Sequence, residues 1–277
     1  MRSLLILASA AVWAGCVAVP GTVDIDHLAR PQTVTGEMFP ALDDGAHEQQ
    51  SLHFLVRAYG SGKAMRIADI SEAAYQRIMV DTGLSSSFQT AGRYKLVVYA
   101  NADEYRKKTG QPPWSQSVAA GNAIYSYEGG LLDAEISQKL TRLILREYLG
   151  QADQINPDYR WVEAGLANFE ASKAGHPASG GAARAWQPWP AGWQPMPLDS
   201  FIHLAPATER DRDADLWHRQ SQSMVRFMLE RGGRIGFSQF LSALRQNAFF
   251  DKAIADGFPG SWSSLADFYA AWVQAQM

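Results

Sequence analysis

The sequence predicts an α+β fold with a small N-terminal mixed sheet, a buried central helix and a C-terminal helical subdomain. Three observations lead to this prediction. Segments with the length and alternation of strands lie before residue 130. An apolar pattern of helical period fills residues 133–149, and the later periodic segments are all helical as well. Strands followed by helices, without regular alternation of the two, are typical of α+β domains.

The elements of the sheet part follow one another between residues 49 and 130. Residues 51–59 alternate well enough for a strand, and residues 67–82 have helical spacing that ends at Gly83. Residues 94–100 read Y-K-L-V-V-Y-A and predict a strong strand, after which Asn101 is placed to cap a short helix. Residues 117–127 are rich in small residues, and we expect them to form one further strand at the edge of the sheet.

The helical part begins with the segment at 133–149, which is apolar over most of its circumference and should therefore be buried. Further helices are predicted at 159–174, 216–231, 236–247 and 263–276. The segment 175–199 between them is irregular and dense in Pro, Gly and Trp. Its indoles, at Trp186, Trp189 and Trp193, either form an aromatic surface for sugars or Pro-rich peptides or anchor the segment by their burial.

The composition of the 277-residue chain is that of an ordinary globular protein, with 47% hydrophobic residues and a formal charge of −3. No run of Lys or Arg stands out, so we expect no nucleic-acid partner.

The N-terminus predicts export. Residues 1–15 resemble a lipoprotein signal peptide, because a short apolar run leads to W-A-G-C and to Cys16, the single cysteine. Lipidation of Cys16 would anchor the protein to a membrane, and Val17, where an inner-membrane retention signal would have Asp, favours the outer membrane, facing the periplasm. The alternative is a soluble periplasmic protein cleaved near Ala18. Residues 16–48 are predicted to be a tether, and residues 49–277 one domain, divided into a sheet part, 49–130, and a helical part, 131–277.

One motif on the helix predicted at 159–174 resembles part of a known protein family. Residues 161–170 read W-V-E-A-G-L-A-N-F-E, with Glu163 about twenty residues after Arg142 of the buried helix, and a later helix bears Gln-Ser-x-Ser-x-Val-Arg-Phe at 220–227. This order of parts resembles the bacterial peptidase-MA-like family, which belongs to the gluzincin class of zinc peptidases, over roughly residues 50–275. The resemblance implies a zincin-like domain.

The same resemblance implies that the zinc site is degenerate. Gln138 falls on the first zinc histidine, Lys139 on the catalytic glutamate and Arg142 on the second histidine, and only Glu163 matches a metal ligand. Gln222 stands where a tyrosine that stabilises the oxyanion is expected. Gln is a poor zinc ligand, Arg has no lone pair to donate, and Lys139 is no base near neutral pH. We therefore expect no metal, no cofactor and no catalytic residue of the zinc-peptidase kind.

The same residues indicate which side chain could take the place of the zinc ion. A buried Glu163 without zinc would be an uncompensated charge, and we expect Arg142 to pair with it bidentately. The alternative is that each of these two side chains is solvated or caps a neighbouring backbone group.

Two classes of function remain open. The first is a noncatalytic binding or scaffold protein that holds an extended peptide or a cell-wall polymer in the former substrate cleft. The residues expected in that cleft are Ile124, Tyr125, Tyr127, His218 and Gln222. The second is a hydrolase of peptides or glycans that uses non-zinc residues, such as Glu163 or Glu170, as acid or base.

Overall fold

A computed structural model describes residues 38–151, 155–174, 189, 192–203, 206 and 213–276. The predicted signal peptide, Cys16 and most of the predicted tether lie outside these ranges. Within them, no helix is both long enough and apolar enough to cross a membrane.

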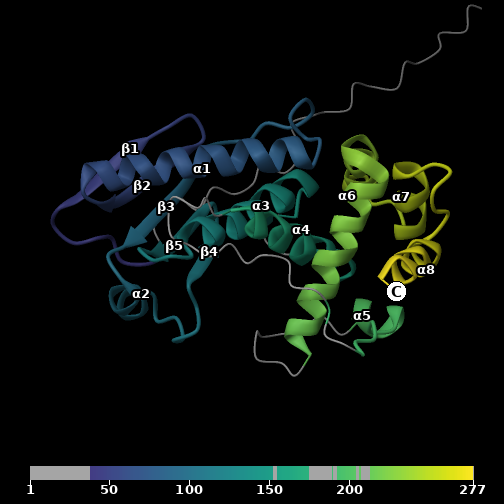
Figure 1. Cartoon of the computed structure of the whole chain (residues 1–277). Coiled ribbons are helices and arrows are strands. Elements are labelled where there is room, and N and C mark those ends of the chain that lie inside the picture. The colour runs from purple at the N-terminus through teal and green to yellow at the C-terminus, as the bar shows by residue number, and fades with distance from the viewer. Residues whose placement is uncertain are drawn as a thin grey trace, which may run out of the picture. The chain divides into compact units, whose positions relative to one another are not determined.

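The strands of the described residues form one mixed sheet of five strands in the order β1-β2-β3-β5-β4 (Figure 1). The strands are β1 (Ala46–Gln50), β2 (Phe54–Tyr59), β3 (Tyr94–Tyr99), β4 (Ser117–Ala120) and β5 (Ala123–Tyr127). The central pairs β2–β3 and β3–β5 are parallel, whereas the two edge strands pair antiparallel with their neighbours. The predicted mixed sheet in the N-terminal part is therefore confirmed.

The predicted single edge strand at 117–127 is wrong, because these residues form the hairpin β4–β5. The two strands are joined by Gly121 and Asn122, and Gly121 has the positive φ of 56° that a tight turn requires. Strand β5 lies between β3 and β4, so β4 forms this edge of the sheet and β1 forms the other.

The predicted tether ends too late, because the folded domain already includes its last part. Strand β1 begins at Ala46, and the ring of Phe39 packs edge-on against Tyr125 at 4.9 Å. The Tyr99 hydroxyl donates a hydrogen bond of 3.0 Å to the carbonyl of Pro40. Residues from Met38 onward therefore belong to the domain.

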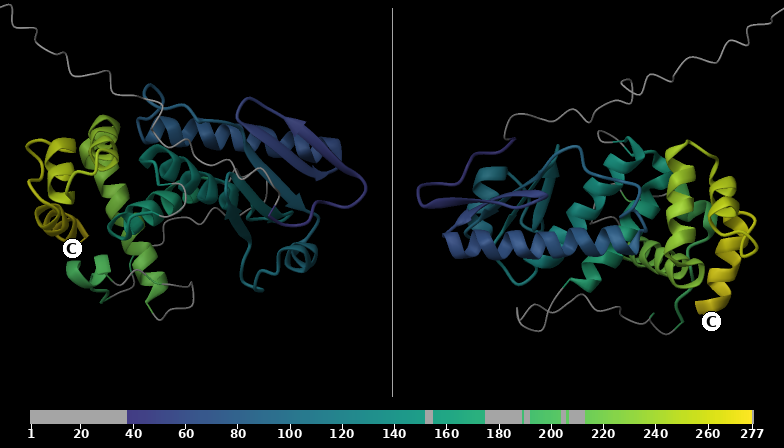
Figure 2. Two further views of the ribbon diagram at one scale, coloured as in Figure 1. Left: turned by 180° about the vertical axis from the view of Figure 1, so that it is seen from behind. Right: turned by 90° about the horizontal axis from the view of Figure 1, so that it is seen from above.

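Both faces of the sheet are covered. Helices α1 (Ser61–Asp81) and α3 (Leu132–Leu149) lie against one face of the sheet (Figure 2). They share one apolar core with Val56 of β2 and Leu96 of β3. On the other face, Val97 and Tyr99 pack with Tyr105 of α2 (Ala102–Thr109). This alternation along β3 follows from the two-residue period of a strand.

Helix α2 has the predicted cap. The side chain of Asn101 accepts hydrogen bonds of 3.0 Å from the backbone amides of Asp103 and Glu104, and Gly110 ends the helix in the left-handed conformation.

The helical part is built around α4 (Arg160–Lys173), which packs between α3 and α6 (Ala214–Arg245) (Figure 1). The two helices predicted at 216–231 and 236–247 are both present, because α6 consists of two helical segments that meet at Gly233, whose φ and ψ of 70° and 174° are not helical. The 3₁₀ turn η2 (Pro157–Tyr159) and the short helices α5 (Leu198–His203) and α7 (Phe250–Gly257) were not predicted, and α8 (Leu265–Gln276) confirms the last predicted helix.

Two tryptophans of the Pro-rich segment are packed against the domain. The rings of Trp189 and Trp193 stack with centroids 3.5 Å apart, and Trp193 meets Trp272 of α8 edge-on at 6.0 Å. The indole N–H of Trp189 donates to the side chain of Gln276 at 3.0 Å. These contacts favour the anchoring role over an aromatic binding surface, whereas Trp186 lies outside the described residues.

The glycine of the E-A-G-L-A motif is required by the approach of α6 to α4. A Cβ atom added at Gly165 would lie 2.3 Å from the carbonyl oxygen of Ser221 and 2.7 Å from the side chain of Val225. Both partners belong to α6, and one of them is backbone. Helix α6 can reach this position only over a glycine.

Replacing Gly165 by alanine is therefore expected to lower the free energy of unfolding by about 1–3 kcal/mol, because two helices must move apart. Urea unfolding followed by circular dichroism measures the change. Gly62→Ala is the matched control, since nothing lies within 4 Å of a Cβ at Gly62 in α1, and it should gain up to about 1 kcal/mol. Equal losses in both variants would contradict the close packing at Gly165.

Candidate functional site

One side of α3 carries a row of polar side chains. The residues recur at intervals of three or four, which places them on one face of the helix. All of them are half-buried: Glu135, Gln138, Lys139, Arg142 and Arg146. Helix α4 runs antiparallel beside this row, because Gln138 contacts Asn168 whereas Arg146, two turns later, contacts Glu163.

Glu163 is buried, with 4% of its side chain exposed, and is neutralised by arginines of α3. Nε of Arg146 donates to Oε1 of Glu163, and its Nη2 donates to Oε2 at 3.2 Å. Nη1 of Arg142 lies 3.9 Å from Oε2, too far for a hydrogen bond. The prediction of a guanidinium beside Glu163 is confirmed, but the prediction that Arg142 forms the bidentate pair is wrong. Arg146 forms it, because the helix pair places Glu163 opposite the next turn of α3.

A second polar chain joins three helices at Gln138. The side-chain amide of Gln138 donates to Oδ1 of Asn168 at 2.9 Å, and Nδ2 of Asn168 lies 3.4 Å from Nδ1 of His218 on α6. His218, which was predicted to face the cleft, is thereby connected to the position aligned with the first zinc histidine. Gln222, one turn further along α6, is half-buried and makes no hydrogen bond with this group of described residues.

The structure thus brings together most of the residues that the resemblance aligns with the zinc site. Gln138 and Arg142 lie on the face of α3 that α4 covers, and Glu163 faces Arg142 from α4. Lys139 is half-buried on the same helix. Among the residues that the structure describes, no three or more His, Cys, Asp or Glu side chains are grouped so that they could hold a metal ion.

The cleft residues predicted on the strand at 117–127 divide into two sets. Ile124 and Tyr125 lie on the central strand β5, and each is only 1% exposed, so they belong to the core. Their assignment to a cleft is wrong, because the predicted edge strand is a hairpin. Tyr127, at the end of β5, does line a pocket.

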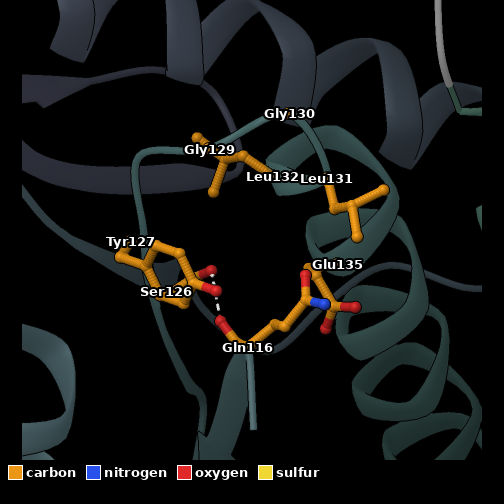
Figure 3. Close-up of a pocket in the computed structure, with 8 residues that line it drawn as sticks. All are labelled: Gln116, Ser126, Tyr127, Gly129, Gly130, Leu131, Leu132 and Glu135. Atoms are coloured by element: carbon orange, nitrogen blue, oxygen red, sulfur yellow. Dashed lines mark hydrogen bonds between the residues drawn. The ribbon is translucent and has the colours of Figure 1, made fainter. Parts of the chain in front are cut away.

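That pocket has a volume of about 200 Å³ and lies where β5 passes into α3. It is bounded by Gln116 and Glu135 near one end and by the Gly129–Gly130 turn opposite them (Figure 3). The hydroxyl of Ser126 donates a hydrogen bond of 2.8 Å to the carbonyl of Gln116, which closes one wall. Glu135 accepts a hydrogen bond from the hydroxyl of Ser117, the first residue of β4. The polar row of α3 therefore begins at this pocket.

Glu170, the second acidic residue of the motif, is also part of a buried ion cluster. Its side chain is fully buried, and its Oε2 accepts a hydrogen bond of 3.0 Å from Nε of Arg77 on α1. Arg77 also donates to the hydroxyl of Ser137 on α3 at 2.9 Å, and Lys173 lies 3.5 Å from Glu170. Burial raises the pKa of Glu170, against the opposing effect of Lys173 and Arg77.

No protein family matches this chain, and no curated protein is similar to it. The site is therefore interpreted from its own contacts.

Two residues of the site were missed from the sequence. Arg146 lies one turn after Arg142 on the same face of α3, and this spacing marks it as a second candidate partner for Glu163. Asn168, five residues after Glu163, carries no comparable signal, since its role depends on the register of α3 against α4.

Arg146→Ala is expected to lower the free energy of unfolding by about 3 kcal/mol, because it leaves the buried carboxylate of Glu163 without its bidentate partner. Arg142→Ala should cost less, since Arg142 makes no hydrogen bond to Glu163. A double-mutant cycle with Glu163→Gln, measured by urea unfolding, should give a coupling energy of about 1–3 kcal/mol for Arg146. Strictly additive losses would contradict the pairing.

Glu170 gives a pH-dependent prediction. Its pKa in the folded state is raised above the ordinary value of 4.5, so the folded state binds its proton more tightly than the unfolded state does. The wild type should therefore gain stability relative to Glu170→Gln as the pH falls from 7 through the raised pKa to about 4.5. Thermal melts of both proteins over this range measure the difference. A wild type that loses stability relative to the variant would show that the folded-state pKa is lowered.

Proposed function

We propose that the protein is a noncatalytic binding or scaffold protein of the bacterial cell envelope, with a gluzincin-like domain whose substrate cleft has become a binding site. The observation that carries the proposal is the neutralisation of Glu163 by Arg146 and Arg142. In a gluzincin the corresponding glutamate would hold zinc together with two histidines. Here the positive charge beside it belongs to side chains of the same chain.

The neighbouring positions support the same interpretation. Lys139 and Arg142 are cations, which repel a divalent metal, and Gln138 is engaged with Asn168. None of these side chains supplies the base that activates water in a zinc peptidase.

The alternative function, a hydrolase that uses Glu163 or Glu170, has less support. A general acid or base must reach the substrate, and both carboxylates are buried and already bound to arginine. Their contacts suit structural roles.

The location in the envelope is proposed from the N-terminal sequence. The apolar run before Cys16 supports export and lipidation, and Val17 supports the outer membrane, with a soluble periplasmic form as the alternative. The proposed ligand is an extended peptide or a cell-wall polymer, and the proposed partner of the lipid anchor is the membrane.

Metal analysis and turnover assays test the proposal. The purified wild type should carry no stoichiometric zinc by mass spectrometry and should hydrolyse neither peptide nor peptidoglycan substrates, because the described residues include no group of side chains that could hold zinc and activate water. Stoichiometric zinc, or a turnover that disappears in Glu163→Gln, would overturn the proposal.

A variant with restored zinc ligands tests separately whether these helices are arranged as in a gluzincin zinc site. The changes Gln138→His, Lys139→Glu and Arg142→His recreate the ligand helix, and Arg146→Ala releases Glu163. This variant should acquire about one zinc ion per chain, and adding Glu163→Gln should weaken that binding by about tenfold or more. A restored variant that binds no zinc would contradict the gluzincin-like arrangement of the helices, although the wild type could still be noncatalytic.

A further inference from the structure

We propose that Arg142 binds the C-terminal carboxylate of an extended peptide, and that a basic side chain two residues before that terminus enters the pocket beside Glu135. This inference rests on the proposed function and names the ligand class of the same cleft.

The guanidinium of Arg142 has donors to offer. Its single described polar contact is the 3.9 Å approach to Glu163, and its Nε is buried without a hydrogen-bond acceptor. Leaving such a group unsatisfied is costly, and a planar guanidinium suits a carboxylate, which can accept two parallel hydrogen bonds. About a quarter of the side chain, 26%, is exposed, so a ligand can reach it.

The charge around Glu163 is also unbalanced. Arg142 and Arg146 bring two positive charges to one carboxylate, and Arg146 makes both of the hydrogen bonds to it. One positive charge therefore remains at Arg142. An anionic ligand group would neutralise it.

The other end of the polar row has the opposite sign. Oε2 of Glu135 accepts a hydrogen bond from Ser117, but no ion pair with Lys or Arg is formed by Glu135 within the described residues. This carboxylate lines the pocket of about 200 Å³, which has room for a side chain (Figure 3). A basic side chain is the complementary occupant.

The spacing of the two charges fits a short peptide. Glu135 and Arg142 are seven residues apart on α3, a rise of about 10 Å at 1.5 Å per residue. An extended peptide covers about the same distance in three residues. Strand β4, which begins at Ser117 beside Glu135 and contacts α3, is an edge strand whose backbone can pair with such a peptide. A polyanion fits less well, because Glu135 would repel it.

Calorimetric titration of the full chain with acetyl-Lys-Ala-Ala tests the inference. The peptide with a free C-terminal carboxylate should bind at least about tenfold more tightly than its C-terminal amide, because the amide has no negative charge and only one oxygen to accept the two parallel hydrogen bonds from Arg142. Replacing Lys by norleucine in the peptide, or Glu135→Gln in the protein, should weaken binding by a similar factor.

Protein variants test whether the preference for the peptide acid over its amide depends on Arg142. Arg142→Gln should bind acid and amide alike, whereas Arg231→Gln, an exposed arginine of α6 beside Phe227, should keep the wild-type preference. If Arg142→Gln does not fold, Arg142→Lys serves in its place, and it should lose most of the preference because an ammonium group cannot form the two parallel bonds.

Four results would overturn the inference: no binding of the acid, equal binding of acid and amide by the wild type, a preference that survives Arg142→Gln, or tighter binding of inorganic phosphate than of the acid. The last would mark a phosphate site. Each is distinguishable from failure of the proposed function, which is decided by zinc content and turnover.

Discussion

Helix α4 buries two carboxylates, and the packing of the surrounding helices depends on how each of them is neutralised. Glu163 is bound by Arg146 from α3, and Glu170 by Arg77 from α1. An unpaired carboxylate in either place would cost several kcal/mol, so the arginines restrict how α1 and α3 can lie against α4. On the opposite side, Gly165 lets the backbone of α6 come close. The position of α4 is therefore determined by ion pairs on the side of α1 and α3, and by close backbone packing at Gly165 on the side of α6.

The broad architecture could be predicted because it depends on local patterns. The strand at 94–99 and the helix at 132–149 have strong periodicity over their whole length, and the structure confirms both. The hairpin β4–β5 was missed, although Gly121–Asn122 is a two-residue turn signal, because the apolar residues on both sides read as one strand. The break at Gly233 between two predicted helices was predicted correctly, since its φ and ψ of 70° and 174° are open to glycine and interrupt helical geometry.

The site was harder to predict, because it depends on the register between helices. Spacing alone places Gln138, Arg142 and Arg146 on one face of α3, but both arginines could reach Glu163. The two arginines are one turn apart, so the register of α4 against α3 decides which of them makes the bidentate pair. Asn168 contacts Gln138 through the same register, and His218 reaches Asn168 from α6, 50 positions away in the sequence. No local pattern contains this information.

The pairing of Glu163 with Arg146 also affects when the domain can assemble. A structural metal site couples folding to the supply of an ion, so that such a domain stays partly unfolded where the ion is scarce. An arginine is synthesised with the chain, always in a ratio of one to one and always charged. This part of the domain carries its own counter-ion. It can therefore reach its folded form in a compartment whose metal content varies, and chelators would leave the helix pair α3–α4 intact.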